Sequence, residues 1–415
     1  MPRSPDRRRA GAVGIGLLAV GLGGFALARA RSQGATATSV AKVVPVASAL
    51  ATAPAHARAV SSGLAKAASV ATASVVAPSL EPAAPQPDAP IVLAAGGDVN
   101  LGRECGQAIL SDPRYDPFRF MAPLWGDADL RFVNLESQLS DQQGETQSPR
   151  NRLVFTGPPG GAETLAQAGI AVVSTANNHA WDYGRSAFFE TLDNLTRAKV
   201  ANAGTGRTLS RAYEPVILDV RGRRIAVLAV THIWNAGPIE EHEGKNYVAW
   251  ARLNRLKASL ERARRDADFV VLSYHGGVEY VDAPIDQTRR FIDSVVKTGL
   301  VDVVIGHHPH VPQGVGFREG RPVFYSLGNF VFAGHDWAPW TNYGLVARVE
   351  LGPARAVRVS ACPVSIDGHF PTPVPASDAR SAKVREHLVS TSTSVGRVRI
   401  GEADARGCFS IEPAT

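Results

Sequence analysis

Short apolar runs, each followed by a polar side chain, recur along the chain from residue 91 onward. The first run, at 91–98, ends in Gly-Gly-Asp. Apolar runs of this length bounded by turn residues are typical of buried strands. Comparable runs occupy residues 130–136, 170–179, 224–232, 268–275, 301–308, 322–332, 345–351 and 356–366. The pattern therefore predicts a series of largely buried strands.

Helical patterns separate these runs at residues 158–168, 184–198, 253–265 and 286–298, and a later one lies at 381–391. Strands that alternate with helices of about 10–15 residues indicate an α/β fold. The chain has 415 residues, of which 45% are hydrophobic and 20% charged. This composition supplies enough apolar material for a packed core.

The first 90 residues differ in composition from the rest. A basic segment at 1–9 precedes an uncharged run at 10–28, the pattern of a signal peptide or an N-terminal membrane anchor. We therefore expect residues 1–30 to export the protein to the cell envelope, either membrane-anchored or periplasmic or extracellular. Residues 31–90 contain no aromatic residue and few large apolar ones, so burial cannot offset their chain entropy. We expect a disordered tether here.

The net charge of +6 is of the kind seen in nucleic-acid-binding proteins, but the distribution of the arginines does not support that function. The arginines cluster at the N-terminus and along the helical pattern near 252–265, without interleaved aromatics, so we expect no nucleic-acid partner. Cys105, Cys362 and Cys408 are too few and too scattered for a disulfide framework or a cysteine-based zinc site. One bridge can form, with one thiol left over, and the sequence does not identify the pair.

His307, His308 and His310 follow the predicted strand at 301–305. Open α/β sheets bind their ligands at the carboxyl ends of strands. Pro309 biases His308 toward an extended conformation, in which residues two apart point the same way. We therefore expect His308 and His310 to converge on one ligand. Because imidazole is the commonest metal ligand, a metal ion is the ligand that this pair suits.

Other polar residues also fall at or just past the ends of predicted strands, where they would share one edge of a sheet. A mixture of oxygen and imidazole donors without thiolates suits one or two divalent ions such as Mn, Zn or Fe, and Glu136 could bridge two of them. The alternative is a hydrogen-bonded polar cluster without metal. The full set is Asp98, Asn100, Glu136, Asn178, His179, His275, His308 and His310.

Six motifs in chain order resemble those of the capsule-synthesis protein CapA family, which is associated with poly-γ-glutamate biosynthesis and export. They are GDVNLGR (97–103), NLES (134–137), NNHAWDYG (177–184), HGGVEY (275–280), GHHPHVPQ (306–313) and YSLGNFVF (325–332). That family is in turn similar to the calcineurin-like metallophosphoesterases. The resemblance implies an αββα sandwich, two mixed sheets flanked by helices, with a metal site at the strand ends.

The resemblance to the phosphoesterases also implies roles for single residues. Asn100 stands in the place of a histidine, which weakens one metal position, and Glu136 stands in the place of a bridging aspartate. His179 matches an outer-sphere acid or phosphate contact. The implied metal ligands are Asp98, Asn100, Glu136, Asn178, His275, His308 and His310.

Further residues belong to the capsule-family motifs alone. Arg103 suits bidentate pairing with a carboxylate or phosphate. Asp182 and Glu279 either contribute to anion recognition or brace the ligand histidines. The expected catalytic residues are His179, Asp182 and Arg103, and the expected substrate-binding residues are Arg103, Glu279, Gln313 and Asn329.

The leading hypothesis is an exported CapA-like protein that acts on an anionic polymer such as poly-γ-glutamate, in company with a membrane synthase complex. A second hypothesis is a metal-dependent phosphoesterase acting on an exported phosphorylated or lipid-linked substrate. A third is a polymer-binding or assembly factor without catalysis, which Asn100 favours. We expect a metallophosphoesterase-like domain at 91–370 and a C-terminal tail at 371–415.

Overall fold

The computed structural model describes residues 89–334, 338–353 and 356–414. The expected export segment at 1–30, and all but the last two residues of the expected tether at 31–90, lie outside the described residues. Within the described part of the chain, no helix combines the length and apolar character that crossing a membrane requires.

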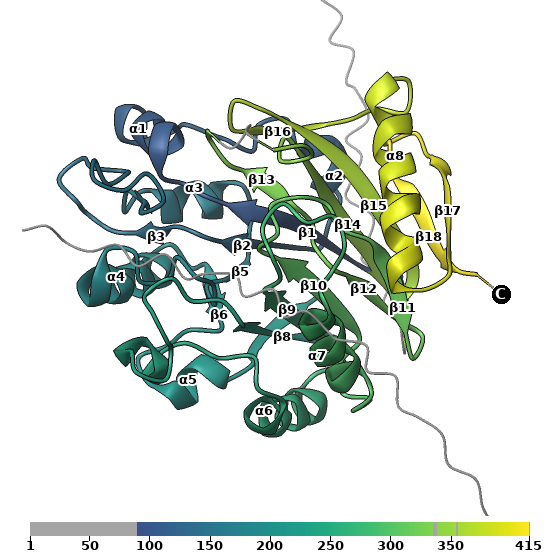
Figure 1. The fold of residues 1–415 in the computed structure, drawn as a ribbon, viewed down its shortest axis with the longest axis horizontal. Helices are drawn as coiled ribbons and strands as arrows, with labels where there is room; N and C mark the ends of the chain where they lie inside the picture. The colour runs from purple at the N-terminus through teal and green to yellow at the C-terminus, as the bar shows by residue number, and fades with distance from the viewer. Residues whose placement is uncertain (1–88, 335–337, 354–355, 415) are drawn as a thin grey trace, which may run out of the picture. The chain divides into compact units, whose positions relative to one another are not determined.

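A ten-stranded mixed sheet forms one layer of the fold (Figure 1). On one side of β1 (Ile91–Val99) lie the parallel strands β2 (Leu130–Leu135), β5 (Val172–Ser174) and β6 (Ala201–Ala203). On its other side lie the antiparallel strands β14 (Tyr343–Leu351), β15 (Ala356–Asp367), β18 (Phe409–Pro413) and β17 (Val398–Ala403). Two short strands complete the sheet, β13 (Asn329–Val331) beside β1 and β16 (Phe370–Pro373) beside β15.

A six-stranded mixed sheet forms the second layer. Its parallel strands are β8 (Arg223–Thr231), β9 (Phe269–His275), β10 (Val303–His307) and β12 (Arg321–Phe324). Its antiparallel edges are β7 (Val216–Val220) and β11 (Val315–Arg318). A separate small pair consists of β3 (Gln138–Leu139) and β4 (Thr156–Gly157).

The two sheets pack face to face. Because alternate residues of a strand point to opposite faces, each strand contributes to the core between the sheets and to a cluster on its outer face. Leu93 of β1 belongs to the same buried cluster as Phe269 and Val271 of β9, so this cluster is the core between the sheets. The intervening residue Ala94 packs into a second cluster, on the outer face of the ten-stranded sheet. Val270 of β9 likewise packs into a third cluster, on the outer face of the six-stranded sheet.

Helices cover both outer faces. The ten-stranded sheet carries α1 (Arg103–Ser111), α2 (Ala122–Trp125) and α3 (Gly161–Gln167), whose apolar residues join the second cluster. It also carries α4 (Gly184–Arg197), where Leu195 joins the second cluster while Phe188 and Leu192 join the first. The six-stranded sheet carries α5 (Leu209–Tyr213), α6 (Leu253–Asp266) and α7 (Asp286–Val296). A 3-10 turn, η1 (Glu243–Asn246), lies between β8 and α6 in the chain. The predicted architecture of two mixed sheets flanked by helices is confirmed.

The predicted strand at 322–332 is divided between the two sheets. Its first part is β12 of the six-stranded sheet, and its last part is β13, which pairs with β1 of the ten-stranded sheet. Gly328 has φ +70° between the two strands, a conformation that glycine adopts without a steric penalty. The chain thus crosses from one sheet to the other immediately before Asn329.

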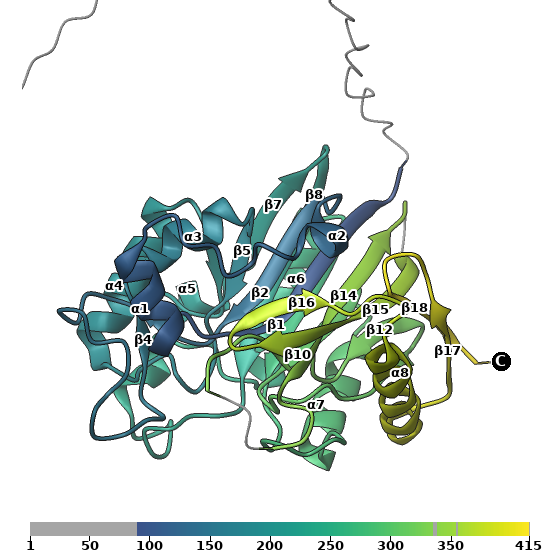
Figure 2. The same ribbon diagram turned by 90° about the horizontal axis from the view of Figure 1, so that it is seen from above.

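A C-terminal tail was expected at residues 371–415, and the described part of it, 371–414, contributes ordered elements to the same fold. These residues form α8 (Ala379–Ser392), the short turn η2 (Thr393–Val395) and the hairpin β17–β18. The hairpin joins the ten-stranded sheet through β15, and a disulfide links Cys362 of β15 to Cys408. In both views α8 lies beside β17 and β18 (Figures 1 and 2). The predicted helix at 381–391 corresponds to α8.

Candidate functional site

The predicted strand-end residues meet where parallel strands of both sheets end. The ten-stranded sheet contributes residues from β1 and from the segments after β2 and β5. The six-stranded sheet contributes the last residue of β9 and the segment after β10. All the side chains concerned are at most 5% exposed: Asp98, Asn100, Glu136, Asn178, His179, His275, His308 and His310.

Asp98 is fixed by contacts from both sheets. Its Oδ1 accepts a hydrogen bond from Nδ2 of Asn134 at 2.9 Å, and its Oδ2 accepts one from the backbone N–H of His308 at 3.2 Å. Nδ1 of His307 lies 3.3 Å from Oδ1. Burial opposes ionisation, but His307, His310 and Asn134 outweigh it and lower the pKa of Asp98. Asp98 is therefore held as a carboxylate.

Glu136 is fully buried, and neither of its carboxylate oxygens has a hydrogen-bond partner. Its Oε1 lies 3.6 Å from Nε2 of His275 and 3.7 Å from Nε2 of His310. Burial, followed by repulsion from Asp98 and other acids, raises the pKa of Glu136 well above its usual value. A buried carboxylate without a partner is costly, so this position calls for a cation.

The donor atoms around Glu136 form two groups that share its carboxylate. One contains Glu136, His275 and His308, the other Asp98, Glu136 and His310, and within each the three donor atoms lie within 4.8 Å of one another. Two carboxylates and three imidazoles are a donor set that fits Mn, Zn or Fe. The shared position of Glu136 agrees with its expected role as a bridge between two ions.

His275 and His308, which come from the six-stranded sheet, are neutral in this environment. Burial, followed by repulsion from neighbouring histidines, lowers the pKa of His275 well below its usual value. Burial also lowers the pKa of His308 to about 4. Nε2 of His275 is 2.7 Å from Oδ1 of Asn178, so this amide oxygen and this imidazole converge on the same place. A neutral imidazole is the form that binds a metal.

His308 and His310 converge as expected, but not through an extended backbone. His308 has φ +99° and His310 has φ +59°, and their ring centroids are 6.0 Å apart. The bias that Pro309 imposes on the preceding residue is overridden here. A positive φ in residues other than glycine costs of order 1–3 kcal/mol and persists where surrounding contacts impose it. One such contact is the hydrogen bond from the His308 N–H to Asp98.

His179 lies in a stack of side chains beside the metal-ligand groups. Its Nδ1 is 2.8 Å from Oδ2 of Asp182, which also accepts the backbone N–H of Phe155 at 3.0 Å. The Phe155 ring stacks on His179 with centroids 4.3 Å apart. Asp182 and Phe155 together fix the plane of the imidazole. This arrangement agrees with Asp182 acting as a brace for a histidine.

Arg103 packs on the other face of this stack, with its guanidinium carbon 4.9 Å from the Phe155 centroid. Nη1 donates to the Ala333 carbonyl at 2.7 Å, and Nη2 donates to the Arg152 carbonyl at 3.1 Å. The side chain is buried, and burial lowers its pKa. Both Nη groups of Arg103, which were expected to pair with an anion, are thus used in hydrogen bonds that connect two loops of the protein.

The remaining predicted residues occupy distinct positions around the site. Oδ1 of Asn100 accepts the backbone N–H of Gly102 at 2.8 Å, so the atom that could bind a metal already takes part in a turn. Asn329 accepts a hydrogen bond from Nδ1 of His310 at 2.9 Å and therefore orients the His310 ring. Nε2 of Gln313 donates to the Val281 carbonyl at 2.7 Å. Glu279 is exposed, and it forms a third donor group with His308 and His310.

Two residues of the site were missed by sequence reasoning. His307 is fully buried against Asp98, and Asn134 joins Asp98 to His275, whose Nδ1 is 3.3 Å from the Asn134 amide nitrogen. Asn134 lies two residues before Glu136, so the period of two along a strand was a usable signal. The sequence placed His307 beside His308 and His310 after the predicted strand, but it was not assigned to the site; it is the last residue of β10.

Comparison with known proteins agrees with the arrangement of motifs. The family model described as bacterial capsule synthesis protein PGA_cap matches residues 92–334. The PGA biosynthesis protein CapA of Bacillus subtilis is 27% identical over 307 residues, which cover 74% of this chain and 80% of that protein. The capsule biosynthesis protein CapA of Bacillus anthracis is 26% identical over 301 residues, covering 71% and 72% of the two chains.

Among solved structures, the sulfate thiohydrolase SoxB of Thermus thermophilus is similar with a TM-score of 0.36 and 14% sequence identity. The similarity covers 69% of this chain and 46% of that one.

Proposed function

This chain belongs to the PGA_cap family of bacterial capsule synthesis proteins, and we propose that it acts in the synthesis or export of an anionic capsule polymer of the poly-γ-glutamate class through a divalent metal site. The names of its Bacillus relatives, a PGA biosynthesis protein and a capsule biosynthesis protein, support the polymer class. The residues proposed to hold one or two ions are Asp98, Glu136, Asn178, His275, His308 and His310.

The observation that carries the metal site is the unpartnered carboxylate of Glu136. Without a cation, burial drives Glu136 toward its protonated form and His275 toward its neutral form. A bound divalent ion would supply Lewis-acid stabilisation to a negatively charged oxygen of the substrate. The protein's own contribution is to hold the donors in place: Asn134 and His308 fix Asp98, and Asn329 fixes His310.

We further propose that the protein is exported. The basic segment and apolar run within residues 1–30 are the first support. The second is the Cys362–Cys408 disulfide, because disulfides persist in oxidising compartments and are rare in the cytosol.

The test is a deletion of the gene in a source strain shown to make surface polymer. We expect the surface polymer to be lost, to return with the wild-type gene, and to stay absent with a His308→Ala/His310→Ala variant expressed at the same level. Unchanged polymer in the deletion strain would refute the proposed role.

A metal-dependent phosphoesterase is the second candidate, and the His179–Asp182 pair favours it. A histidine whose ring is fixed by a carboxylate is suited to proton transfer to a leaving group. Full-length protein loaded with Mn²⁺ or Zn²⁺ should then hydrolyse a phosphoester such as p-nitrophenyl phosphate, and His179→Gln should reduce the rate at least tenfold. Absence of turnover on a panel of phosphoesters, with the metal bound, would reject this candidate.

Polymer binding that survives the His308→Ala/His310→Ala change would then favour a role in assembly without catalysis.

A further inference from the structure

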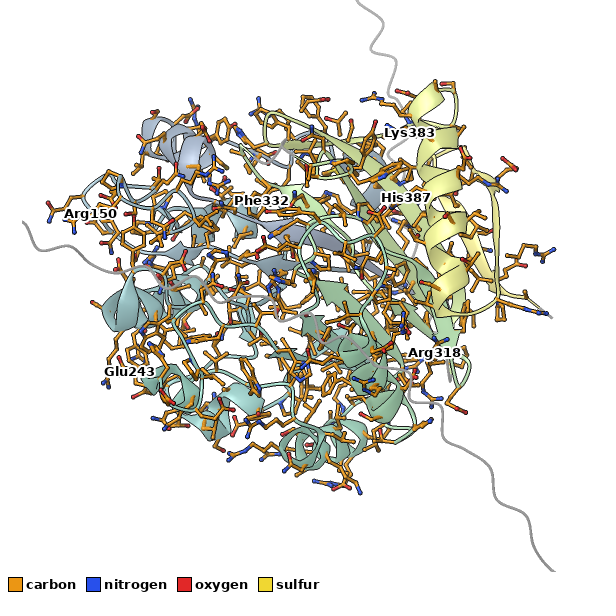
Figure 3. The ribbon with its side chains drawn as sticks, viewed as in Figure 1. Arg150, Glu243, Arg318, Phe332, Lys383 and His387 are labelled. Carbon is orange, nitrogen blue, oxygen red and sulfur yellow. A yellow bond between two sulfur atoms is a disulfide. The ribbon has the colours of Figure 1, made fainter. Side chains whose placement is uncertain are left out.

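Helix α8 lies outside the region that matches the family model, yet it contacts the segment that carries the metal-ligand histidines. His387 and Lys383 both lie on this helix (Figure 3). His387 is only 8% exposed, and it makes two specific contacts that lead back to His310.

The first contact is a hydrogen bond from His387 to the backbone of the histidine segment. Nε2 of His387 lies 2.8 Å from the carbonyl oxygen of Pro312, two residues after His310. A carbonyl only accepts, so Nε2 of His387 carries the hydrogen. Pro312 has no N–H of its own, and its carbonyl is anchored through α8.

The second contact is with Trp340. The two rings stack with centroids 3.9 Å apart and an interplanar angle of 29°. Trp340 has φ +70°, which is strained for a bulky residue and requires contacts that hold it. Besides His387, the ammonium of Lys383 lies 5.0 Å from the Trp340 ring. Two of the contacts that hold the indole therefore come from α8, and a further one is with the Tyr343 ring of β14, with centroids 5.4 Å apart.

Thr341 directly follows Trp340 in the chain, and its hydroxyl also donates to the Ala338 carbonyl at 2.7 Å. The carbonyl of Thr341 accepts a hydrogen bond from Nδ2 of Asn329 at 2.9 Å. Oδ1 of the same amide accepts the hydrogen bond from Nδ1 of His310 at 2.9 Å. The route from α8 to the site thus runs through Trp340 and Thr341 to Asn329, and ends on the ring of His310.

The hydrogen bond at Nδ1 determines which nitrogen of His310 can bind a metal. With Nδ1 donating to Asn329, Nε2 keeps its lone pair, and Nε2 is the atom that lies 3.7 Å from Glu136. Partners of this kind, which orient ligand histidines, typically change metal affinity by 10–100-fold when they are removed.

Helix α8 also packs tightly against the residues after the histidine segment. The backbone N–H of Val315 donates to Oγ of Ser392 at 3.0 Å. A Cβ atom at Gly314 would meet the Thr391 carbonyl oxygen at 2.7 Å, so only glycine allows this approach. The contact of His387 with Pro312 is therefore part of a continuous interface and not an isolated one.

We propose that His387 is a positioning residue for the metal site: it holds the Pro312 carbonyl and the Trp340 ring so that His310 presents Nε2 to the ion. This inference rests on the proposed metal site. It gives the C-terminal segment, outside the family match, an indirect part in the site.

The test compares full-length wild type, His387→Ala and the control Val389→Ala, which alters an exposed position of the same helix. Co²⁺ serves as the probe, since its visible absorption reports its ligand geometry. We expect His387→Ala to weaken Co²⁺ binding at least tenfold and to change the spectrum, with Val389→Ala matching the wild type. In metal-free His387→Ala, amide hydrogen exchange should increase at residues 306–316. If His387→Ala does not purify in folded form, His387→Phe, which keeps a ring against Trp340 but lacks the donor to the Pro312 carbonyl, tests the hydrogen bond alone, and we expect it to increase amide exchange at residues 306–316.

The possible results separate the inference from the function on which it rests. Wild-type affinity and spectrum in His387→Ala would overturn the inference alone. Faster exchange confined to α8 and the β17–β18 hairpin would also overturn it, because that pattern reports only local loosening. Wild-type protein that takes up no Co²⁺ would overturn the proposed metal site, and the exchange at 306–316 would still decide whether His387 holds the segment.

Discussion

Oε1 of Glu136 lies 3.6 Å from Nε2 of His275, and the two residues come from different sheets. Glu136 directly follows β2, and His275 is the last residue of β9. The packing of the sheets therefore brings the pair together. Burial raises the pKa of the carboxyl and lowers the pKa of the imidazole, so neither charge is favoured without a further cation. A divalent ion favours the carboxylate and the neutral imidazole together.

The first prediction contrasts Glu136 with Asn100. Glu136→Gln keeps the size of the side chain but removes the shared carboxylate, so we expect at least a tenfold loss of Mn²⁺ or Zn²⁺ affinity. Asn100→Ala should change the affinity less than threefold, because the Asn100 amide oxygen is engaged by the Gly102 N–H. Isothermal titration of the metal-free proteins measures both. An equal loss in the two variants would show that Asn100 binds the ion directly.

The second prediction concerns acid stability of the metal-free protein. The pKa of His308 is about 4 in the folded state, against about 6.5 in the unfolded chain. The unfolded chain therefore takes up this proton first, and the stability that a neutral His308 contributes is lost as the pH falls from 6.5 toward 4. Between pH 7 and pH 4, wild type should lose on the order of 3 kcal/mol more unfolding free energy than His308→Gln.

Urea unfolding in the presence of a chelator measures this difference at each pH. Comparing the two proteins cancels the contributions of other titrating groups, including Glu136, whose raised pKa acts in the opposite direction. Parallel pH profiles for wild type and His308→Gln would contradict the prediction.

The strand-end positions of the site were predictable because they follow from local pattern. An apolar run that ends in a polar residue, such as 91–98, marks both the strand and the residue that it presents at its end. Asp98, Glu136 and His275 were identified in this way. Such a run can be recognised in the sequence without knowing which strand pairs with it.

Features that depend on contacts between distant segments were not predictable. The positive φ of His308 is stabilised by Asp98, 210 residues earlier in the chain, and local bias from Pro309 gave the wrong conformation. The pairing of Cys362 with Cys408 depends on β18 joining β15, which the sequence pattern did not indicate. The use of Arg103 as a link between loops likewise depends on two carbonyls far along the chain.

The third prediction tests that role of Arg103. Arg103→Lys cannot donate to the Ala333 and Arg152 carbonyls in the same geometry, so we expect a loss of about 2–3 kcal/mol in unfolding free energy. The matched control is Arg114→Lys, where the side chain is 91% exposed and little change is expected. Urea unfolding gives both values. Equal stability of the two variants would instead leave Arg103 free for the anion-binding role expected from its motif.

The fourth prediction concerns the Cys362–Cys408 disulfide, which ties the C-terminal hairpin to β15. The bridge closes a loop with a sequence separation of 46 residues, and its removal should lower the unfolding free energy by about 2–4 kcal/mol, since the unfolded chain gains freedom. Urea unfolding should show this loss in a Cys362→Ala/Cys408→Ala variant. A reducing agent should lower the stability of the wild type toward that of the variant and leave the variant unchanged, because Cys105 is buried without a disulfide partner. A wild type insensitive to reductant under unfolding conditions, or a variant as stable as the wild type, would mean that the bridge does not form or does not contribute.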